Sequence, residues 1–247
     1  MKRRILGKRA VYEALLASGE IHVVYVSAKE RVELAKIGAL AQRKGVVVET
    51  VAEDTLNHLA KGLPHQGVVA IAGSYSYVPL ESLLERPSTG PKHLVALDEI
   101  TDPHNLGAIV RSAVAFGYQG VILPRHRAAS VTAVVVRASA GGTEHARIAR
   151  VSNLSKVLVY LREEHGFEVV GLDAGAEISL QALTPSDRNR VLVVGSEGKG
   201  LRRLVRQSCD QLARIDMTGP LESLNASVAA AIAMYSLSTV TISSTNL

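Results

Sequence analysis

The sequence predicts an α/β protein in which a small α/β domain precedes a larger domain with a mostly parallel sheet and helices on both faces. Runs of β-branched residues alternate with helix-length amphipathic segments along nearly the whole chain, as in a sheet joined by crossover helices. A stretch rich in Pro, Ser and Gly interrupts this alternation once. The chain is therefore predicted to divide into domains at 1–73 and 93–247, joined by a linker at 74–92.

Bulk composition predicts a globular protein of a reducing compartment. The 247 residues are 47% hydrophobic and 21% charged, which is an ordinary balance for a packed domain. No apolar run approaches the roughly 18 residues of a membrane span, so no membrane partner is expected. The basic start, Lys2-Arg3-Arg4, is not followed by the apolar core of a signal peptide. The single cysteine, Cys209, excludes a disulfide framework and suits the cytoplasm.

Positive charge is clustered along the chain. The net charge is +5 and the pI is near 9.4, which is typical of proteins that bind nucleic acid. Basic residues recur in short groups in both halves of the chain: Lys2-Arg3-Arg4, Lys8-Arg9, Arg125-His126-Arg127, Arg188 with Arg190, and Arg202-Arg203 with Arg206. Such groups fit a long phosphate backbone better than a small anion, although some of them are expected to be solvated surface.

The first 73 residues are predicted to form three helices and three strands. Helices are expected around Val11–Leu15, over 32–44 and over 56–63, with Gly19 and Gly45 ending the first two. Strands are expected at 21–26, 46–48 and 66–72. The linker contains Pro79, Pro87 and Pro91 and one short predicted helix, 80–84.

From His93 onward, strands and helices alternate to the end of the chain. Strands are predicted at 93–98, 120–123, 146–151, 167–172, 190–194 and 211–216. Helices are predicted at 105–116, 131–140, 153–165, 200–207 and 225–238. The last helix is rich in alanine, so it can pack very close to another backbone.

The segment Asp98–Gly107 places polar residues between a strand and a helix. Asp102 or Asn105 can cap that helix, and Arg111 follows Asn105 by six residues. Both Asn105 and Arg111 are placed to face one site near the helix N-terminus, where anions bind well. A capping asparagine and an ordinary surface arginine would give the same pattern. His104 has no second ligand at metal-binding spacing, so no metal is expected.

Two further motifs follow the strands at 190–194 and 211–216. The first is Gly-Ser-Glu-Gly-Lys-Gly at 195–200, with three glycines and Glu197, which indicates either close approach to a backbone or a tight turn. It lacks the Ser or Thr of a P-loop and the spacing of a dinucleotide fingerprint. The second is Ile215–Ser227, in which Ser223 or Asn225 can cap the alanine-rich helix. Ser223 lacks the surroundings of a hydrolase nucleophile.

The three motifs, in this order, resemble the SpoU (TrmH-type) RNA 2'-O-methyltransferases of the SPOUT class. The pattern is N-x5-R, then G-S-E-G-x-G-L, then S-L-N-x-S at the head of an alanine-rich helix. Residues 101–107, Thr-Asp-Pro-His-Asn-Leu-Gly, are especially similar to the bacterial members that methylate a guanosine ribose in 23S rRNA. The segments 7–11 and 65–70 resemble the ribosomal-protein-like RNA-binding domain that precedes the catalytic domain in one subgroup.

The resemblance implies a trefoil knot in residues 190–236, a homodimer built on the knot helices, and S-adenosylmethionine as cofactor. It implies that the backbone at three positions contacts the cofactor: Gly195, Ile215 and Leu224. It implies that five residues occupy the catalytic positions: Asn105, Arg111, Glu197, Ser223 and Asn225. The family assigns activation of the ribose hydroxyl to Arg111; a guanidinium that keeps its proton would instead stabilise charge on the oxygen.

Two other functions remain open on the sequence alone. One is the same chemistry on tRNA, although the N-terminal α/β unit favours 23S rRNA by analogy with the family. The other is a non-catalytic RNA-binding factor for ribosome assembly, which would have no chemical need for the five catalytic-type residues.

Overall fold

The computed structural model describes residues 2–17, 19–29, 34–85, 90–183, 188–221 and 223–238, which form two compact units. The first unit is built on the N-terminal residues to Ser76 and also includes residues 106–111 and 130–145. The second unit holds the rest. The domain limits inferred from the sequence remain a prediction.

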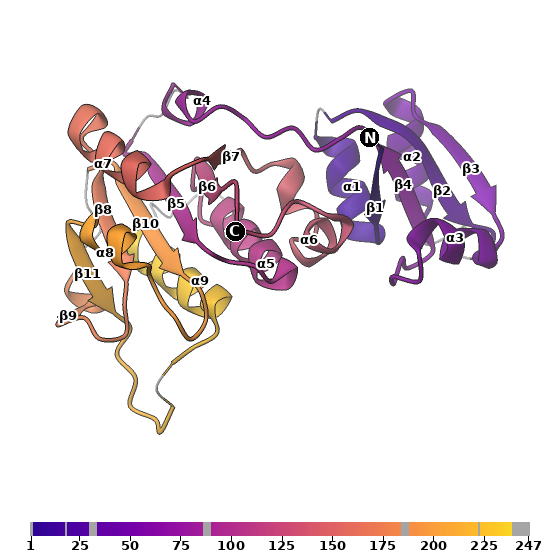
Figure 1. Cartoon of the computed structure of the whole chain (residues 1–247). Coiled ribbons are helices and arrows are strands. Elements are labelled where there is room, and N and C mark those ends of the chain that lie inside the picture. Colours follow the sequence, from indigo (N-terminus) through magenta and orange to yellow (C-terminus); the bar gives the residue numbers. More distant parts are fainter. Residues whose placement is uncertain are drawn as a thin grey trace, which may run out of the picture. The chain divides into compact units, whose positions relative to one another are not determined.

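The first unit contains a four-stranded mixed sheet (Figure 1). Its strands are β1 (Arg3–Leu6), β2 (Ile21–Ser27), β3 (Val47–Val51) and β4 (Val68–Ala72), in the order β1-β4-β2-β3. Strands β2 and β3 are parallel, and the other neighbours are antiparallel. The helices that join them are α1 (Lys8–Leu16), α2 (Ala35–Arg43) and α3 (Glu53–Ala60).

Alternating side chains of β4 divide the core of this unit between the two faces of the sheet. Val68 and Ala70 belong to the cluster that includes α1 and α2, while Val69 packs with Leu56 and Ala60 of α3. The first cluster also takes in Val136 of α6 (Ala133–Ala138), a helix from much later in the chain. Arg3 and Glu144 join the same two chain regions by two hydrogen bonds of 2.7 and 2.6 Å.

The second unit contains a seven-stranded sheet in which every described pair is parallel, in the order β7-β6-β5-β10-β8-β11-β9. The strands are β5 (His93–Asp98), β6 (Gly120–Pro124), β7 (Ile148–Val151), β8 (Glu168–Leu172), β9 (Ile178–Ser179), β10 (Arg190–Gly195) and β11 (Gln211–Arg214). The presence of a large parallel sheet in one unit and a small α/β sheet in the other confirms the predicted fold class.

Helices cover both faces of this sheet, as its buried strands require. The helices are α4 (Glu81–Leu84), α5 (Pro103–Ala115), α7 (Leu154–His165), α8 (Arg203–Gln207) and α9 (Ala226–Leu237). Val191 and Val193 of β10 face the cluster that includes α4, α7 and α8. Leu192 and Val194 therefore face the other side, where α9 packs on β10 (Figure 1).

The structure departs from the sequence-based elements in several places. The strands β1 and β9 were not expected. Helix α8 begins at Arg203 rather than residue 200, because residues 195–202 form a glycine-rich loop. Helix α6 is shorter than the predicted 131–140, because Ala140 and Gly141 adopt positive φ values of 51° and 85°. Residues 32–33 of the second predicted helix and 86–89 of the linker lie outside the described residues.

Part of the predicted linker belongs to the core of the second unit. Val78 forms a parallel bridge with Ala149, and Leu83 of α4 is fully buried. None of the helices in the described ranges is both long and apolar enough to cross a membrane.

Candidate active site

Three of the predicted motifs meet at the carboxyl ends of neighbouring parallel strands. Gly195, the last residue of β10, pairs with Asp98, the last residue of β5. Helix α5 starts five residues after Asp98, and Asp102 caps it by accepting a hydrogen bond of 2.9 Å from the backbone N–H of His104. Asn105 consequently lies in the first turn of α5, inside the helix rather than at its cap. This edge is where open α/β sheets place their ligands.

A bonded cluster of Asn105, Glu197 and Asn225 joins the three motifs. Glu197 Oε1 accepts from Asn105 Nδ2 at 2.9 Å, from Asn225 Nδ2 at 2.6 Å and from the backbone N–H of Ala226 at 3.4 Å. Asn225 Nδ2 also donates to Asn105 Oδ1 at 3.0 Å. The lone pairs of Glu197 Oε1 are therefore occupied, which favours a positioning role for this oxygen over that of a general base. We call this set the amide–carboxylate cluster.

Asn225 connects the cluster to helix α9. Its Oδ1 accepts from the backbone N–H groups of Ser227 at 2.9 Å and Val228 at 3.3 Å, so Asn225 is the N-cap of α9. The alternative sequence-based cap, Ser223, is exposed, and in the part of the chain that the structure describes its side chain makes no hydrogen bond.

The glycine loop, residues 195–202, folds back onto its own beginning. Gly200 N–H donates to the Ser196 carbonyl at 2.9 Å. A Cβ at Gly195 would lie 2.3 Å from the carbonyl carbon of Gly200 and 2.6 Å from the nitrogen of Leu201. Glycine at 195 is thus required by the packing of the loop itself, independently of any ligand.

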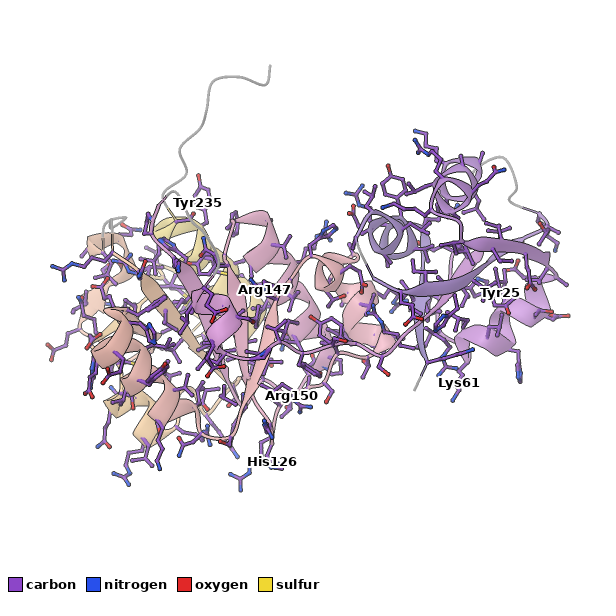
Figure 2. All side chains as sticks on the ribbon, turned by 90° about the horizontal axis from the view of Figure 1, so that it is seen from above. Tyr25, Lys61, His126, Arg147, Arg150 and Tyr235 are labelled. Atoms are coloured by element: carbon purple, nitrogen blue, oxygen red, sulfur yellow. The ribbon has the colours of Figure 1, made fainter. Side chains whose placement is uncertain are left out.

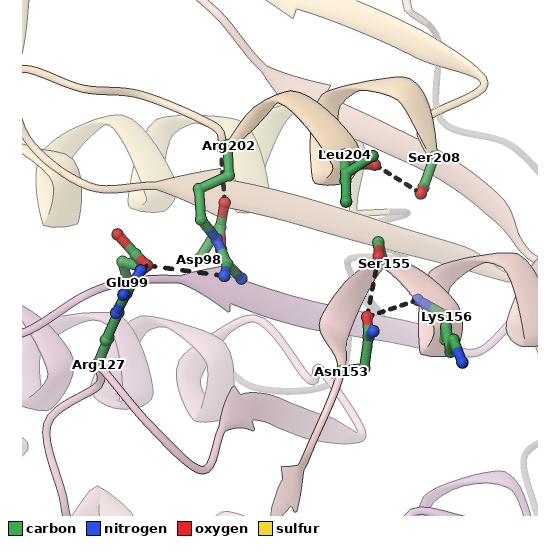
Figure 3. A network of polar contacts seen from close by, with 9 residues as sticks. All are labelled: Asp98, Glu99, Arg127, Asn153, Ser155, Lys156, Arg202, Leu204 and Ser208. Carbon is green, nitrogen blue, oxygen red and sulfur yellow. Dashed lines mark hydrogen bonds and ion pairs between the residues drawn. The ribbon is translucent and has the colours of Figure 1, made fainter.

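A buried carboxylate anchors the far end of the glycine loop (Figure 3). Asp98 is completely buried, and it accepts hydrogen bonds from Arg202 Nε at 2.7 Å and from the backbone N–H of Arg202 at 2.8 Å. The hydrogen bond to Asp98 is the main cause of a raised pKa for Arg202. Arg202 and Arg127 also approach Glu99, at 3.6 and 3.4 Å.

The β11 loop, residues 215–225, is held by fewer contacts in its described part. Ile215 and Leu224 are half-buried, whereas Leu221 is 72% exposed and Met217 is 37% exposed. Figure 1 shows the loop extending away from the strand ends before the chain enters α9. Asp216 is bonded to Arg214 at 3.0 Å and to Ser179. The loop thus presents apolar side chains to solvent, and its last residue, Asn225, belongs to the amide–carboxylate cluster.

Arg111 is not part of the amide–carboxylate cluster. It is exposed on α5, and among the described residues its guanidinium has no hydrogen bond or ion pair. Positions six apart on an α-helix differ by about 240° of rotation, so Arg111 and Asn105 leave α5 in different directions. The predicted role of Arg111 therefore stays a prediction, as do the cofactor contacts of Gly195, Ile215 and Leu224.

Sequence reasoning missed Asp98 and Arg202 as components of this region. Asp98 ends a strand whose other residues are all apolar or buried, and a carboxylate in such a place requires a partner. The sequence therefore indicated that Asp98 needs a partner, but it did not indicate which residue, about a hundred positions away, would provide it. Cys209, after α8, is half-buried, and burial raises the pKa of its thiol to about 12. In the described ranges, no group of three or more His, Cys, Asp or Glu residues could hold a metal ion.

Comparison with known proteins places this arrangement in a family. Residues 92–235 match the SpoU rRNA Methylase family, and residues 4–78 match the family described as RNA 2'-O ribose methyltransferase substrate binding. An uncharacterised tRNA/rRNA methyltransferase of Mycolicibacterium gilvum is 43% identical over 239 residues, which cover 93% of this chain and 74% of that protein. A Bacillus subtilis protein assigned to the TrmH family of tRNA/rRNA methyltransferases is 38% identical over 94% of this chain and 93% of its own.

A solved structure shares the architecture of nearly the whole chain. The SpoU methyltransferase AviRb of Streptomyces viridochromogenes, in complex with AdoMet, has a TM-score of 0.77 and 27% identity. The match covers 95% of this chain and 88% of AviRb. The family match to more than half of the chain, the relatives and the shared fold agree: this protein belongs to the SpoU rRNA methylase family.

Proposed function

We propose that this protein transfers a methyl group from S-adenosylmethionine to the 2'-oxygen of a guanosine ribose in 23S rRNA. The observation that carries the proposal is the amide–carboxylate cluster, in which Glu197 binds Asn105 and Asn225 from two other motifs. These are three of the positions that the family uses for chemistry, and they meet at the ligand-binding edge of a parallel sheet. The cytoplasm is the proposed location, because ribosomal RNA is the proposed substrate.

The residues at this edge fit S-adenosylmethionine, which supplies an activated methyl group when it is bound. The exposed Met217 and Leu221 and the half-buried Ile215 offer apolar contacts for an adenine ring. Backbone groups of the glycine loop and of Leu224 offer hydrogen bonds for its edge. We assign cofactor contacts to Gly195, Ile215 and Leu224 on this basis, and the cluster keeps the two loops that carry them together.

Arg111 is assigned to the ribose rather than to the cofactor. A ribose hydroxyl is a weak nucleophile: as its oxygen bonds the methyl carbon, the methyl–sulfur bond of the donor would break and the hydroxyl proton would pass to water. Arginine keeps its proton at neutral pH, so Arg111 acts by holding the adjacent phosphate and stabilising negative charge on the 2'-oxygen. The exposed guanidinium of Arg111 is available for such a contact. Ser223 and Asn225 orient the substrate side of the same edge.

The test is transfer of a labelled methyl group from S-adenosylmethionine to 23S rRNA that lacks its modifications, with tRNA as a parallel substrate. We expect incorporation at a guanosine 2'-oxygen of the rRNA. Arg111→Ala should lower kcat by roughly 10²-fold or more, as for loss of one electrostatic stabiliser, while cofactor affinity stays within about twofold. Near-normal transfer by Arg111→Ala would refute its role.

The two alternatives give different results in the same assay. Transfer to tRNA alone would keep the chemistry and replace the substrate. Tight RNA binding without transfer to either RNA would favour a ribosome-assembly factor. The relatives named as tRNA/rRNA methyltransferases keep tRNA as the second candidate.

We further propose that the protein acts as a homodimer in which the partner chain completes the site at Arg111. Helix α9 exposes three apolar side chains at helical spacing: Val228, Ile232 and Tyr235. This stripe supports a dimer interface on α9. A charged substitution there, Ile232→Asp, should give a folded monomer that has lost methyl transfer. Full activity of a monomer verified by light scattering would contradict the proposal.

A trefoil knot in residues 190–236 belongs to the same proposal. It is supported by the return of the chain, after β11, to α9 and to contacts of Asn225 with Asn105 and Glu197 beside the central strand β10. We also keep the division into domains at 1–73 and 93–247, which the separate family matches to 4–78 and 92–235 support.

A further inference from the structure

The loop after β6 carries a group of basic residues that the proposed chemistry does not use. Arg125, His126 and Arg127, which we call the basic loop, are all exposed. Strand β6 is parallel to β5 and pairs with it directly. The basic loop therefore leaves the sheet at the same edge as residues 98–107, which lead into the amide–carboxylate cluster.

The backbone of the basic loop is fixed at both ends. Arg125 N–H donates to the Val151 carbonyl at 2.8 Å, and the Arg125 carbonyl accepts from Arg150 Nη2 at 2.9 Å. Beyond the loop, Ala129 N–H donates to the Ile100 carbonyl at 2.8 Å. This last bond ties the basic loop to the segment that follows β5. The three side chains are thus presented from a defined backbone.

Arg150 supports the loop from beneath. Its guanidinium lies 5.0 Å from the centre of the Tyr77 ring, which is within cation–π range. Figure 2 shows His126 at the outer margin of this unit and Arg150 further inside it. Nη2 of Arg150 is therefore engaged with the loop backbone, while the side chains of the basic loop are exposed to solvent.

The charge of Arg127 is only weakly compensated. Arg127 adopts a left-handed backbone with φ of 56°, and its Nη1 lies 3.4 Å from Oε1 of Glu99. The Arg127 side chain is 77% exposed, and such surface ion pairs contribute little. Glu99 is also shared with Arg202. A phosphate can consequently compete for Arg127 at small cost.

We propose that the basic loop binds successive phosphates of a single RNA strand that flanks the target ribose. This inference rests on the proposed function and assigns it a substrate-holding surface. Arg125 and Arg127 stand on either side of His126 in the sequence. Each guanidinium group can bind phosphate oxygens through paired N–H donors. A flexible single strand can place a ribose at the sheet edge and its neighbouring phosphates on the loop, whereas a paired duplex buries the bases and holds its backbone stiff.

The experiment compares salt-dependent binding of a 23S rRNA transcript by wild type and by Arg125→Gln/Arg127→Gln. Each lost phosphate contact on a single strand lowers the slope of log K against log salt by about 0.7, so the double variant should lose about 1.4. Its affinity at 0.1 M salt should fall on the order of tenfold. Affinity for S-adenosylmethionine, measured by calorimetry, should not change.

Two matched variants isolate the effect of charge at this place. Arg125→Lys/Arg127→Lys keeps both charges and should retain most of the slope, although it loses the paired donors. Arg188→Gln removes an exposed arginine from the residues that precede β10, at the opposite edge of the sheet. It should bind RNA as wild type does.

Failure of this inference is distinguishable from failure of the proposed function. If wild type methylates RNA and the glutamine pair keeps the wild-type slope and affinity, the basic loop is not the phosphate surface. The same conclusion follows if the lysine pair loses as much slope as the glutamine pair. If wild type binds RNA but transfers no methyl group, the proposed function fails, and the slopes still decide the role of the basic loop. If wild type does not bind RNA, both are overturned.

Discussion

The glycine loop and the β11 loop leave the same edge of one sheet, yet they are held in very different ways. The glycine loop is fixed by its own backbone at Gly200, by Glu197 and by Arg202 on the buried Asp98. The β11 loop exposes Leu221 and Met217 instead. A loop with few buried apolar contacts opens at low free energy. We therefore expect one half of the site to be preformed and the other to become ordered around its ligand.

The largest expected effect comes from adding one methyl group to the glycine loop. Gly195→Ala places a Cβ against the Gly200 backbone, which cannot yield without moving the loop. Overpacking of this kind costs about 1–3 kcal/mol, and we expect S-adenosylmethionine affinity to fall by at least tenfold. Gly219→Ala is the matched control, because nothing lies within 4 Å of its Cβ position. Calorimetric titration of both variants with S-adenosylmethionine measures this difference. Equal affinities would contradict the expectation that only the glycine loop is preformed.

The next effect is expected on the free energy of unfolding, through the ion pairs that hold the two loops. Arg202→Gln leaves the carboxylate of Asp98 buried without its charged partner, and should lower the free energy of unfolding by about 1–3 kcal/mol. Arg214→Gln removes a pair with Asp216 in which both side chains are 38% exposed, together with hydrogen bonds to the Ala176 and Glu177 carbonyls. It should lower the free energy of unfolding by about 1 kcal/mol or less. Urea denaturation at neutral pH measures both. If Arg214→Gln lost more free energy of unfolding than Arg202→Gln, the β11 loop would be the more firmly held of the two loops.

The smallest expected effect is on an exposed side chain of the β11 loop. Leu221→Ser should change the free energy of unfolding by less than about 0.5 kcal/mol, since Leu221 is already in water. Affinity for S-adenosylmethionine should nevertheless fall several-fold, because the side chain gains its contacts only with ligand. Hydrogen exchange should show added protection at 216–221 on binding and little change at 196–200. Equal protection of both loops would show that neither is preformed.

Local pattern was enough to predict most of the strands and helices. Runs rich in β-branched residues, such as 190–194, favour buried strands, and Gly and Pro mark where the elements end. Strand β1 was missed because Arg3 and Arg4 make up half of it, and charge there indicated surface. Strand β9 has two residues, which is below any detectable period. Helix propensity predicted that α6 continues to residue 140, because propensity alone does not indicate that Ala140 adopts a left-handed conformation.

The order of the motifs in the sequence was enough to name the residues of the amide–carboxylate cluster. The resemblance named Asn105, Glu197 and Asn225, and the structure joins them by hydrogen bonds. It could not indicate that Asp98 and Arg202 anchor the glycine loop, because long-range ion pairs leave no periodic signal. It also named Ser223, which the structure leaves exposed and outside the cluster. The glycines at 195–200 left a close ligand approach and a tight turn both open, and the contacts of Gly195 with Gly200 show that the turn itself requires glycine.

The position of β10 has a consequence for how the chain is made. His93 at the start of β5 pairs with Arg190 at the start of β10, and β10 then separates β5 from β8 in the middle of the sheet. During translation at about 5–20 residues per second, β5 waits roughly 5–20 s for its partner, about a hundred residues downstream. The backbone N–H and C=O groups on that edge of β5 lack their β10 partners for that time. We therefore expect this edge to be a place where the nascent chain can pair wrongly until residue 195 has emerged.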